Sequence, residues 1–309
     1  MSPAAARGGG GGGQLEAALA RALGSPVVRS SGVSGGDINQ ASQVALADGR
    51  ELFVKTNPGA PATMFAAEAR GLAWLAEAAA LRLPAVVAVS SPDDPVHFLV
   101  LELVRRGRPA RGFDDALGHG LAALHRFGAP GFGLDHDNFI GRLPQANHPV
   151  GAGAGGGAQD WASFYRQRRL EPQLRLAVDH GLASGEMRRG FARLFTELDA
   201  LVGPPEPPAR LHGDLWGGNL MCDAEGAPCL IDPAVYGGHR EIDLAMMRLF
   251  GGFGARVFAA YEEAWPLAPG HAARVDLYQL YPLMVHVNLF GGGGYVGSVE
   301  SALGRVLAR

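Results

Sequence analysis

Three side chains that carry oxygen atoms follow one another at short spacing in the second half of the chain. Asp214 is followed five positions later by Asn219, and Asp232 ends a short apolar run. A carboxylate can accept the proton of an incoming hydroxyl group, and side-chain oxygens can hold Mg2+ against nucleotide phosphates. Positioning and charge neutralisation carry most of the catalysis in phosphoryl transfer. The spacing therefore predicts a phosphoryl-transfer site, with Asp214 as the proton acceptor and with Asn219 and Asp232 as metal ligands.

The composition singles out one cation. Lys55 is the only lysine among the 27 basic residues of the chain. An ammonium group is a compact point charge, whereas guanidinium is a wide planar fork, so a narrow site between phosphate oxygens can require lysine. Chance survival of one lysine in an arginine-rich chain is the alternative. We expect Lys55 to contact a phosphate group.

The residues before Lys55 predict a glycine-rich hairpin. Two predicted strands, 26–31 and 39–46, are joined by a turn with three glycines: Gly32, Gly35 and Gly36. Glycine lets the backbone approach a phosphate and turn its N–H groups towards it, although glycine-rich hairpins are common. A third predicted strand then ends at Lys55. We expect the three glycines to contact nucleotide phosphates.

A helical pattern follows, in which apolar residues recur on one face from Phe65 to Ala76. Glu68 falls within this apolar stripe, where an ionised carboxylate is costly unless it is paired. Lys55 is the expected partner, and the pair would hold the ammonium group ready for the phosphates. The alternative places Glu68 at the rim of the stripe, in water.

Two further predicted strands, 86–89 and 97–101, complete a five-stranded antiparallel sheet with one main helix. Glu102, Leu103 and Val104 then leave the edge of this sheet. A glycine-rich loop followed by a lysine on a strand is the order found in kinases, where the segment after the sheet is the hinge. We therefore expect the backbone groups of these three residues to bind adenine.

The rest of the chain is predicted to be mostly helical. Helical periods occur at 114–127, 161–178, 186–202, 241–250, 256–265 and 272–289. A final amphipathic turn or two is expected after the glycines at 291–294, and residues 151–157 are expected to form a surface loop.

The predicted fold class is α+β with two lobes. Residues 1–14 are expected to form a disordered glycine-rich tail. Residues 15–104 would form a nucleotide-binding N-terminal lobe. Residues 105–309 would form a larger, mostly helical lobe with the catalytic loop, the metal site and the acceptor pocket.

Composition narrows the class of partner. A formal net charge of -3 and a pI near 6.4 predict no nucleic acid partner. No apolar run approaches the ~20 residues needed to span a bilayer, and the N-terminus lacks an apolar signal core, so we expect a cytoplasmic protein without membrane contact. Cys222 and Cys229 are expected to be reduced thiols rather than a disulfide or metal site. The sequence leaves the oligomeric state open.

With these residues together, the chain resembles the fructosamine kinase (ketosamine-3-kinase) family, within the protein-kinase-like and aminoglycoside-phosphotransferase-like fold. The resemblance covers nearly everything from Val27 to the C-terminus. His-Gly-Asp with a downstream Asn is common to many small-molecule kinases. The motifs closer to this family are Asp214-Leu215-Trp216 before Gly218-Asn219, Asp232-Pro233-Ala234, and Tyr236-Gly237-Gly238-His239. Some members carry a cysteine in the glycine-rich loop where this chain has Asp37, so redox control through a thiol is not implied.

The resemblance implies ATP-dependent phosphorylation of the O3 hydroxyl of a ketosamine, which is a sugar joined to an amine. Such 3-phosphates are unstable and shed the sugar, which leads to deglycation. The acceptor would be a small-molecule ketosamine or a glycated amine, including a protein lysine, and the cofactors would be ATP and Mg2+. By position, Asp214 would be the proton acceptor, Asn219 and Asp232 the Mg2+ ligands, Lys55 the phosphate contact and Glu68 its anchor.

For the acceptor we select Trp216, His286 and Asn288. Trp216 offers an apolar face next to the proton acceptor, and the other two come from the late helix before the glycine cluster. An equal alternative is that His286 is a core histidine with satisfied hydrogen bonds and no contact with the acceptor. His212 is expected to hold the loop by hydrogen bonds rather than to transfer protons.

Two other functions stay open. A kinase of the same fold would act on another hydroxyl acceptor, such as an aminoglycoside, choline or homoserine. A pseudokinase would bind ATP without catalysis. Against the pseudokinase, every charged group that the chemistry needs is present: Lys55, Glu68, Asp214, Asn219 and Asp232.

Overall fold

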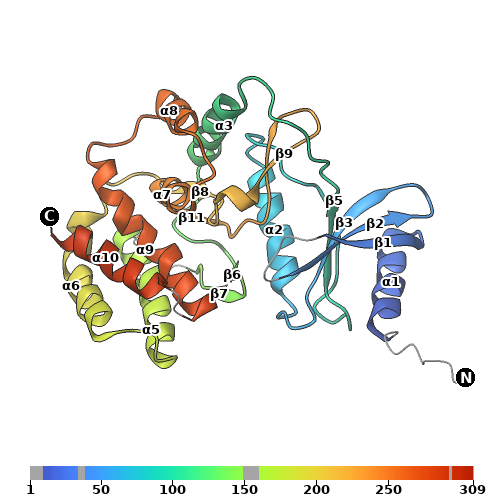
Figure 1. Cartoon of the computed structure of the whole chain (residues 1–309), viewed down its shortest axis with the longest axis horizontal. Helices are drawn as coiled ribbons and strands as arrows, with labels where there is room; N and C mark the ends of the chain where they lie inside the picture. Colours follow the sequence, from blue (N-terminus) through green and yellow to red (C-terminus); the bar gives the residue numbers. More distant parts are fainter. Residues whose placement is uncertain (1–9, 34–38, 149–159, 292–293, 309) are drawn as a thin grey trace, which may run out of the picture. The chain divides into compact units, whose positions relative to one another are not determined.

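The computed structural model of the protein describes residues 10–33, 39–148, 160–291 and 294–308. Figure 1 traces the helices and strands along the chain. The chain divides into two compact units. The first contains residues 1–73 and 84–105, and the second contains residues 74–83 and 106–309. Each unit has its own hydrophobic core.

The first unit is built around an antiparallel sheet that has five strands in the described residues. These are β1 (Val27–Val33), β2 (Gln40–Leu46), β3 (Glu51–Thr56), β4 (Val86–Val89) and β5 (Phe98–Glu102). Their order across the sheet is β1-β2-β3-β5-β4. The five predicted strands are confirmed, with ends that differ by at most two residues.

The two faces of this sheet carry different side chains. Helix α1 (Gly10–Leu23) packs on one face, against alternate residues of the central strands: Val44, Leu46, Leu52, Val54, Phe98 and Val100. Lys55 pairs with Leu99, and Val54 pairs with Val100. Because successive side chains of a strand point to opposite faces, Lys55 lies on the face away from α1. Helix α2 (Met64–Ala76) supplies its partner on that face.

Helix α1 begins earlier than the sequence predicted. The expected disordered tail covers residues 1–14, whereas α1 starts at Gly10, so residues 10–14 are helical. Leu19 is buried against the sheet and anchors the helix. Extending an anchored helix costs far less than starting one, which offsets glycines that each weaken a helix by about 1 kcal/mol. Residues 1–9 of the expected tail lie outside the described residues.

The second unit is mostly helical. Its helices are α3 (Phe113–Phe127), α4 (Trp161–Phe164), α5 (Glu171–Asp179), α6 (Gly185–Leu201), α7 (Glu241–Phe250), α8 (Ala255–Ala264), α9 (His271–Phe290) and α10 (Tyr295–Leu307). Short strands pair within it as β6 (Asn138–Ile140) with β7 (Leu143–Gln145), β8 (Ala209–Leu211) with β11 (Tyr236–Gly238), and β9 (Leu220–Cys222) with β10 (Pro228–Leu230). In Figure 1, α9 and α10 of this unit lie side by side.

Three features of the second unit differ from the prediction. The predicted helix 161–178 is interrupted by a π-helical turn, η1 (Tyr165–Leu170), and the hairpin β6–β7 was not foreseen. Helix α10 has 13 residues rather than a turn or two. Gly297 and Gly304 weaken its helical pattern in the sequence. Packing overrides that weakness, because α10 buries one apolar face against α6 and α9.

Local sequence sets where two helices of the second unit begin. The side chain of Asp160 accepts from the N–H of Ser163 at 2.8 Å, at the start of α4. Ser184 accepts in the same way from the N–H of Met187 at 2.9 Å, at the start of α6. Such caps satisfy N–H groups that have no partner within the helix.

Two predictions concern the cysteines and the helices. Cys222 and Cys229 form no disulfide in the described residues, as expected. In the part of the chain that the structure describes, no helix is both long and apolar enough to cross a membrane. The predicted loop at 151–157 lies outside the described residues.

Candidate active site

A tight turn carries the chain from β8 to Asp214. Gly213 has a left-handed backbone, with φ +82°, and a β-carbon there would collide with the carbonyl oxygen of Ala234. Glycine therefore fits this position, where other residues would be strained and would clash. The N–H groups of His212 and Gly213 donate to the two carboxylate oxygens of Asp243, at 2.8 and 2.9 Å. A single carboxylate thus anchors the turn.

Sequence reasoning missed Asp243. It lies in the first turn of α7, is fully buried, and is hydrogen-bonded to Nε2 of His125 at 3.1 Å. Burial alone would raise the pKa of Asp243, but the hydrogen bond to His125 lowers it below its usual value. The available signal was a carboxylate between Ile242 and Leu244 in an apolar helix, where an unpaired charge would be costly.

Asn219 connects the two predicted aspartates. Its Nδ2 donates to the backbone carbonyl and the carboxylate of Asp214, at 2.8 and 3.1 Å, and to the carbonyl of Asp232 at 3.4 Å. Because three acceptors surround the nitrogen, the amide oxygen faces away from them. Carboxylate and amide oxygens are ligands that Mg2+ prefers. The structure therefore brings the three predicted residues together, and Asn219 and Asp232 fit a magnesium ion.

Asp232 has a backbone conformation that is rare outside glycine, with φ +55°. This costs on the order of 1 kcal/mol and persists where neighbouring contacts enforce it, often at functional sites. The N–H of Ile231 donates to the carbonyl of Asn219 at 3.0 Å, and Nε2 of His212 is hydrogen-bonded to the carbonyl of Ile231 at 2.9 Å. These bonds fix the residue before Asp232, and His212 braces the site as expected.

Asp214 has the electrostatics of a proton acceptor. Burial raises the pKa of its carboxyl to about 7. The hydrogen bond from Asn219 opposes this rise, and the nearby carboxylates of Asp232 and Asp243 add to it. A general base is most effective when its pKa lies near the operating pH.

The predicted ion pair of the first unit is present. Nζ of Lys55 lies 2.5 Å from Oε1 of Glu68, which joins β3 to α2. The Lys55 side chain is 5% exposed. A buried ammonium group requires such a partner, so Glu68 is not at a solvated rim. The phosphate contact assigned to Lys55 stays a prediction.

The structure describes some of the other residues of the first unit that are predicted to contact the nucleotide. Gly32 lies in β1, opposite Ser42. Gly35 and Gly36 lie outside the described residues. Glu102 is the last residue of β5, and its N–H donates to the carbonyl of Ala85 at 2.8 Å. Leu103 and Val104 follow the sheet, and the adenine contact of these residues stays a prediction.

Trp216 lies close to Asp214 and is exposed. Its N–H donates to the carbonyl of Asp214 at 3.2 Å, and the residue is 42% exposed. The adjacent Gly217 packs against Gly251 and Gly252, which follow α7. Trp216 therefore presents an exposed aromatic face next to Asp214, and its contact with an acceptor stays a prediction.

The two other predicted acceptor residues have different surroundings. His286 is hydrogen-bonded through Nδ1 to the carbonyl of Pro282 at 2.8 Å, and its ring lies near those of Phe250, Phe290 and Tyr295. Asn288 is buried, and its Nδ2 donates to both oxygens of Gln173, at 2.9 and 2.7 Å. Residues two apart on a helix do not face each other. The structure therefore does not bring His286 and Asn288 together.

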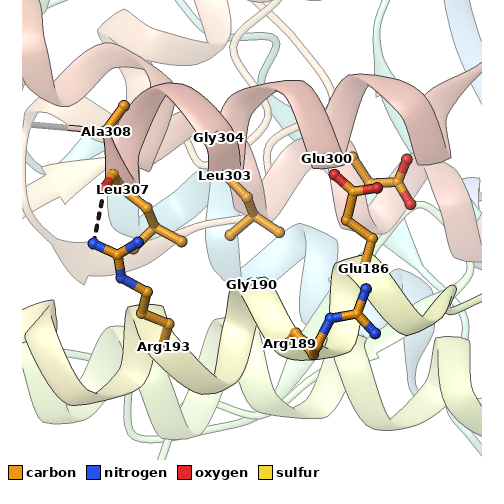
Figure 2. A pocket seen from close by; sticks show the side chains of 9 residues that line it. All are labelled: Glu186, Arg189, Gly190, Arg193, Glu300, Leu303, Gly304, Leu307 and Ala308. Carbon is orange, nitrogen blue, oxygen red and sulfur yellow. Dashed lines mark hydrogen bonds between the residues drawn. The ribbon is translucent and has the colours of Figure 1, made fainter.

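A surface groove elsewhere in the second unit is separate from these residues. Figure 2 shows it between α6 and α10, and its volume is about 370 Å³. Leu303 lines it centrally, with Glu186 and Glu300 near one end and Arg193 near the other. None of the predicted site residues lines this groove. It does not contribute to the candidate active site.

The sequence pattern of the fructosamine kinase family matches residues 14–309. The chain belongs to the fructosamine kinase family. It is therefore a phosphotransferase, as the resemblance predicted, and kinases of this kind use ATP.

Relatives can be aligned with this chain over most of their length. A probable ketoamine kinase from Lactiplantibacillus plantarum is 41% identical over 261 residues, which cover 84% of this chain and 88% of the relative. A chloroplastic protein-ribulosamine 3-kinase from Oryza sativa subsp. indica is 37% identical over 266 residues, which cover 85% of this chain and 74% of the relative.

Solved structures show the fold. A Thermobifida fusca protein, provisionally assigned as a fructosamine-3-kinase, is 38% identical with a TM-score of 0.84, covering 96% of this chain and 99% of that chain. An aminoglycoside phosphotransferase at 18% identity and a TM-score of 0.57 shares the fold alone. The predicted α+β, aminoglycoside-phosphotransferase-like fold is confirmed.

Proposed function

We propose that this fructosamine kinase family member transfers a phosphoryl group from ATP to the O3 hydroxyl of a ketosamine. The observation that carries the proposal is the set of hydrogen bonds from Asn219 to Asp214 and Asp232. These bonds join a proton acceptor to two candidate metal ligands. The rice relative, named as a protein-ribulosamine 3-kinase, supports a sugar-amine acceptor and the O3 position.

In the proposed reaction, the O3 oxygen of the acceptor attacks the γ-phosphorus of ATP, the bond from that phosphorus to the β–γ bridging oxygen breaks, and ADP leaves. Asp214 accepts the proton of the O3 hydroxyl. Its backbone and carboxylate are both held by Asn219, so the carboxylate is oriented before the acceptor arrives. Its raised pKa suits proton transfer near neutral pH. The anchored turn at Gly213 limits its movement.

We assign the metal site to Asn219 and Asp232. The amide oxygen of Asn219 and the carboxylate of Asp232 would hold Mg2+, which would neutralise the negative charge of the phosphates and align them. The backbone strain at Asp232 is consistent with a functional position. The carboxylate of Asp243 serves the turn instead, because both of its oxygens accept backbone N–H groups.

Nucleotide contacts in the first unit complete the proposal. Lys55, fixed by Glu68, is assigned to the phosphates, and the glycines of its hairpin (Gly32, Gly35 and Gly36) are assigned to the same phosphates through their N–H groups. The backbone of Glu102, Leu103 and Val104 is assigned to adenine. A Lys55→Met variant would raise the KM for ATP if this assignment is right, since the ammonium group is lost.

We assign the acceptor to Trp216 and His286. The exposed Trp216 ring lies two residues after Asp214 and offers a flat apolar face to the sugar. Burial lowers the pKa of His286, so its ring is neutral at pH 7 and does not repel a cationic amine near the rings of Phe250 and Tyr295. Asn288 stays a weaker prediction, because its amide is bonded to Gln173.

A phosphorylation assay tests the proposal. Purified protein with Mg-ATP would be offered fructoselysine, ribuloselysine and glycated protein, beside an aminoglycoside, choline and homoserine. We expect ADP release with a ketosamine and a phosphate at O3, located by phosphorus NMR. The product would then shed its sugar, so the protein would act in deglycation. We place this role in the cytoplasm.

The matched control is Asp214→Asn, which keeps the size of the side chain and removes the proton acceptor. It should bind Mg-ATP, as seen by a thermal shift, and transfer almost no phosphate. Wild-type protein that binds Mg-ATP but phosphorylates no ketosamine would remove the acceptor assignment. Equal turnover by Asp214→Asn would remove the role of Asp214.

A further inference from the structure

The segment that follows Asp232 is held by side-chain amides from the β6–β7 hairpin. Gln145, the last residue of β7, donates through Nε2 to the carbonyl of Ala234 at 3.1 Å. Asn138, the first residue of β6, donates through Nδ2 to the carbonyl of Val235 at 2.8 Å. Gln145 is 2% exposed and Asn138 is 5% exposed, so water does not replace these bonds. One hairpin therefore fixes two successive backbone groups.

Ala234 links this hairpin to the catalytic turn. Its N–H donates to the carbonyl of His212 at 2.9 Å, while its carbonyl accepts from Gln145. Ala234 lies two residues after Asp232, and His212 lies two residues before Asp214. A shift of Ala234 would therefore move the two aspartates relative to each other.

Further hydrogen bonds fix the direction of both amides. Oδ1 of Asn138 accepts from Nε2 of Gln145 and from Nδ2 of Asn147, each at 2.8 Å. Oε1 of Gln145 accepts from the hydroxyl of Tyr281 at 2.7 Å. Because donors engage both amide oxygens, the amide nitrogens must face the carbonyls of Ala234 and Val235.

The network ends at Arg169, a fully buried cation in the π-helical turn η1. Its Nη2 donates to Oδ1 of Asn147 at 2.7 Å, and its Nη1 donates to the carbonyl of Ala146 at 2.8 Å. Its guanidinium lies 3.8 Å from the centre of the Tyr236 ring. Buried polar groups are costly unless they are bonded, so this network favours one arrangement of the hairpin.

We infer that Gln145 and Asn138 are positioning residues for phosphoryl transfer, which set the placement of Asp232 against Asp214 through Ala234 and Val235. The inference rests on the proposed function, because it takes the two aspartates to act together. Both amides are bonded to backbone carbonyls, so they act through the backbone. Their loss should therefore lower kcat more than it raises the acceptor KM.

The variant Gln145→Met tests the inference, because it removes the amide and keeps a similar length of side chain. We expect faster amide hydrogen exchange in peptides that cover residues 231–238. With a ketosamine, kcat should fall about 10-fold to 100-fold, the range for residues that orient the ligands of a site. The acceptor KM should stay within about twofold of wild type.

The chain offers a matched control in Gln279→Met. Gln279 is also buried, and its Nε2 also donates to the carbonyl of an alanine, Ala245, at 3.1 Å. This variant should lose a comparable amount of thermal stability, with kcat and the exchange of residues 231–238 as in wild type. A merely structural role for Gln145 predicts that the two variants behave alike.

A second variant covers the case in which Gln145→Met does not fold. Gln145→Glu keeps the acceptor for the hydroxyl of Tyr281 and removes the donor to Ala234, with the same expected results. A folded Gln145 variant with wild-type exchange at 231–238, or with wild-type kcat, would overturn the inference. Hydrogen exchange needs no acceptor, so failure of the wild-type protein to phosphorylate a ketosamine would count against the proposed function alone.

Discussion

Two clusters of charged side chains in the second unit differ in how their carboxylates are hydrogen-bonded. The balanced cluster contains Glu206, Glu241, Arg240 and Arg274, and the other contains Asp214, Asp232 and Asp243. Glu206 accepts two hydrogen bonds from Arg240, each at 2.8 Å, and Glu241 accepts two from Arg274, at 2.5 and 2.9 Å. Asp214, by contrast, accepts a hydrogen bond from the uncharged amide of Asn219. Repulsion from the carboxylates of Asp232 and Asp243 raises the pKa of Asp214.

The pKa values of the two clusters reflect this difference. Burial alone would raise the pKa of Glu206, but the hydrogen bonds from Arg240 bring it below its usual value. Burial raises the pKa of Asp214 to about 7, and the uncharged amide of Asn219 opposes this rise. A carboxylate paired with arginine stabilises the fold, whereas a carboxylate with a strongly raised pKa marks a candidate functional site.

The largest expected effect is on Asp214. Asp214→Asn should lower kcat by about 10²-fold to 10⁴-fold, the usual contribution of a general base. Its melting temperature should stay at or above that of wild type, because the substitution removes repulsion from Asp232 and Asp243. Steady-state kinetics and thermal unfolding measure the two quantities. If Asp214→Asn had a much lower melting temperature and an unchanged kcat, Asp214 would serve stability rather than catalysis.

The balanced cluster should show the opposite pattern. Arg240→Met leaves Glu206 in a poorly solvated site without its cation, which should cost about 3 kcal/mol or more in the free energy of unfolding. At a temperature where the variant is folded, its kcat should be close to wild type. Urea unfolding and kinetics at low temperature provide the check.

Two further variants sharpen this prediction. Glu206→Gln combined with Arg240→Met should recover part of the lost stability, because the stranded carboxylate is removed. Arg256→Met removes an arginine paired with Asp115 and Glu263 on the surface, and its melting temperature should change little. If Arg256→Met were as unstable as Arg240→Met, burial of the ion pair would not explain the loss of stability in Arg240→Met.

A smaller effect is expected from His239, next to the balanced cluster. Burial lowers its pKa from 6.5 to about 4, with Glu206 opposing this shift and Arg274 and Arg240 adding to it. Between these pH values the unfolded chain binds a proton that the folded chain does not, so stability falls as pH falls through the window.

The variant His239→Gln should therefore have a flatter pH dependence. The change in stability between pH 7 and pH 4 that His239 causes is at most about 3 kcal/mol. Urea unfolding at several pH values compares the variant with wild type. Parallel curves for the two proteins would show that His239 does not titrate in this window.

The sequence predicted those parts of the site that depend on short spacing. Asp214 and Asn219 are five residues apart, and a single loop brings them into contact. Lys55 and Glu68 are 13 residues apart, and a strand followed by a helix suffices to pair them. In both cases local structure leaves few alternatives for where the side chains lie.

Partners that are distant in sequence were not predictable. Asp243 binds a turn 30 residues earlier, and Asn138 binds Val235 across 97 residues. No local pattern reports such a contact. Helix periodicity placed His286 and Asn288 on the same helix, but only the structure shows that Gln173 engages Asn288. The π-helical turn that places Arg169 has no recognised signal in the spacing of apolar residues.

Binding of Mn2+ tests the central claim most directly, namely that Asn219 and Asp232 form a cation site next to Asp214. Mn2+ takes oxygen ligands as Mg2+ does and can be followed by electron paramagnetic resonance. With a non-hydrolysable ATP analogue, we predict that Asp232→Asn loses most of the Mn2+ affinity of wild type and that Glu206→Gln retains it. Wild-type affinity in Asp232→Asn, or its loss in Glu206→Gln, would contradict the account.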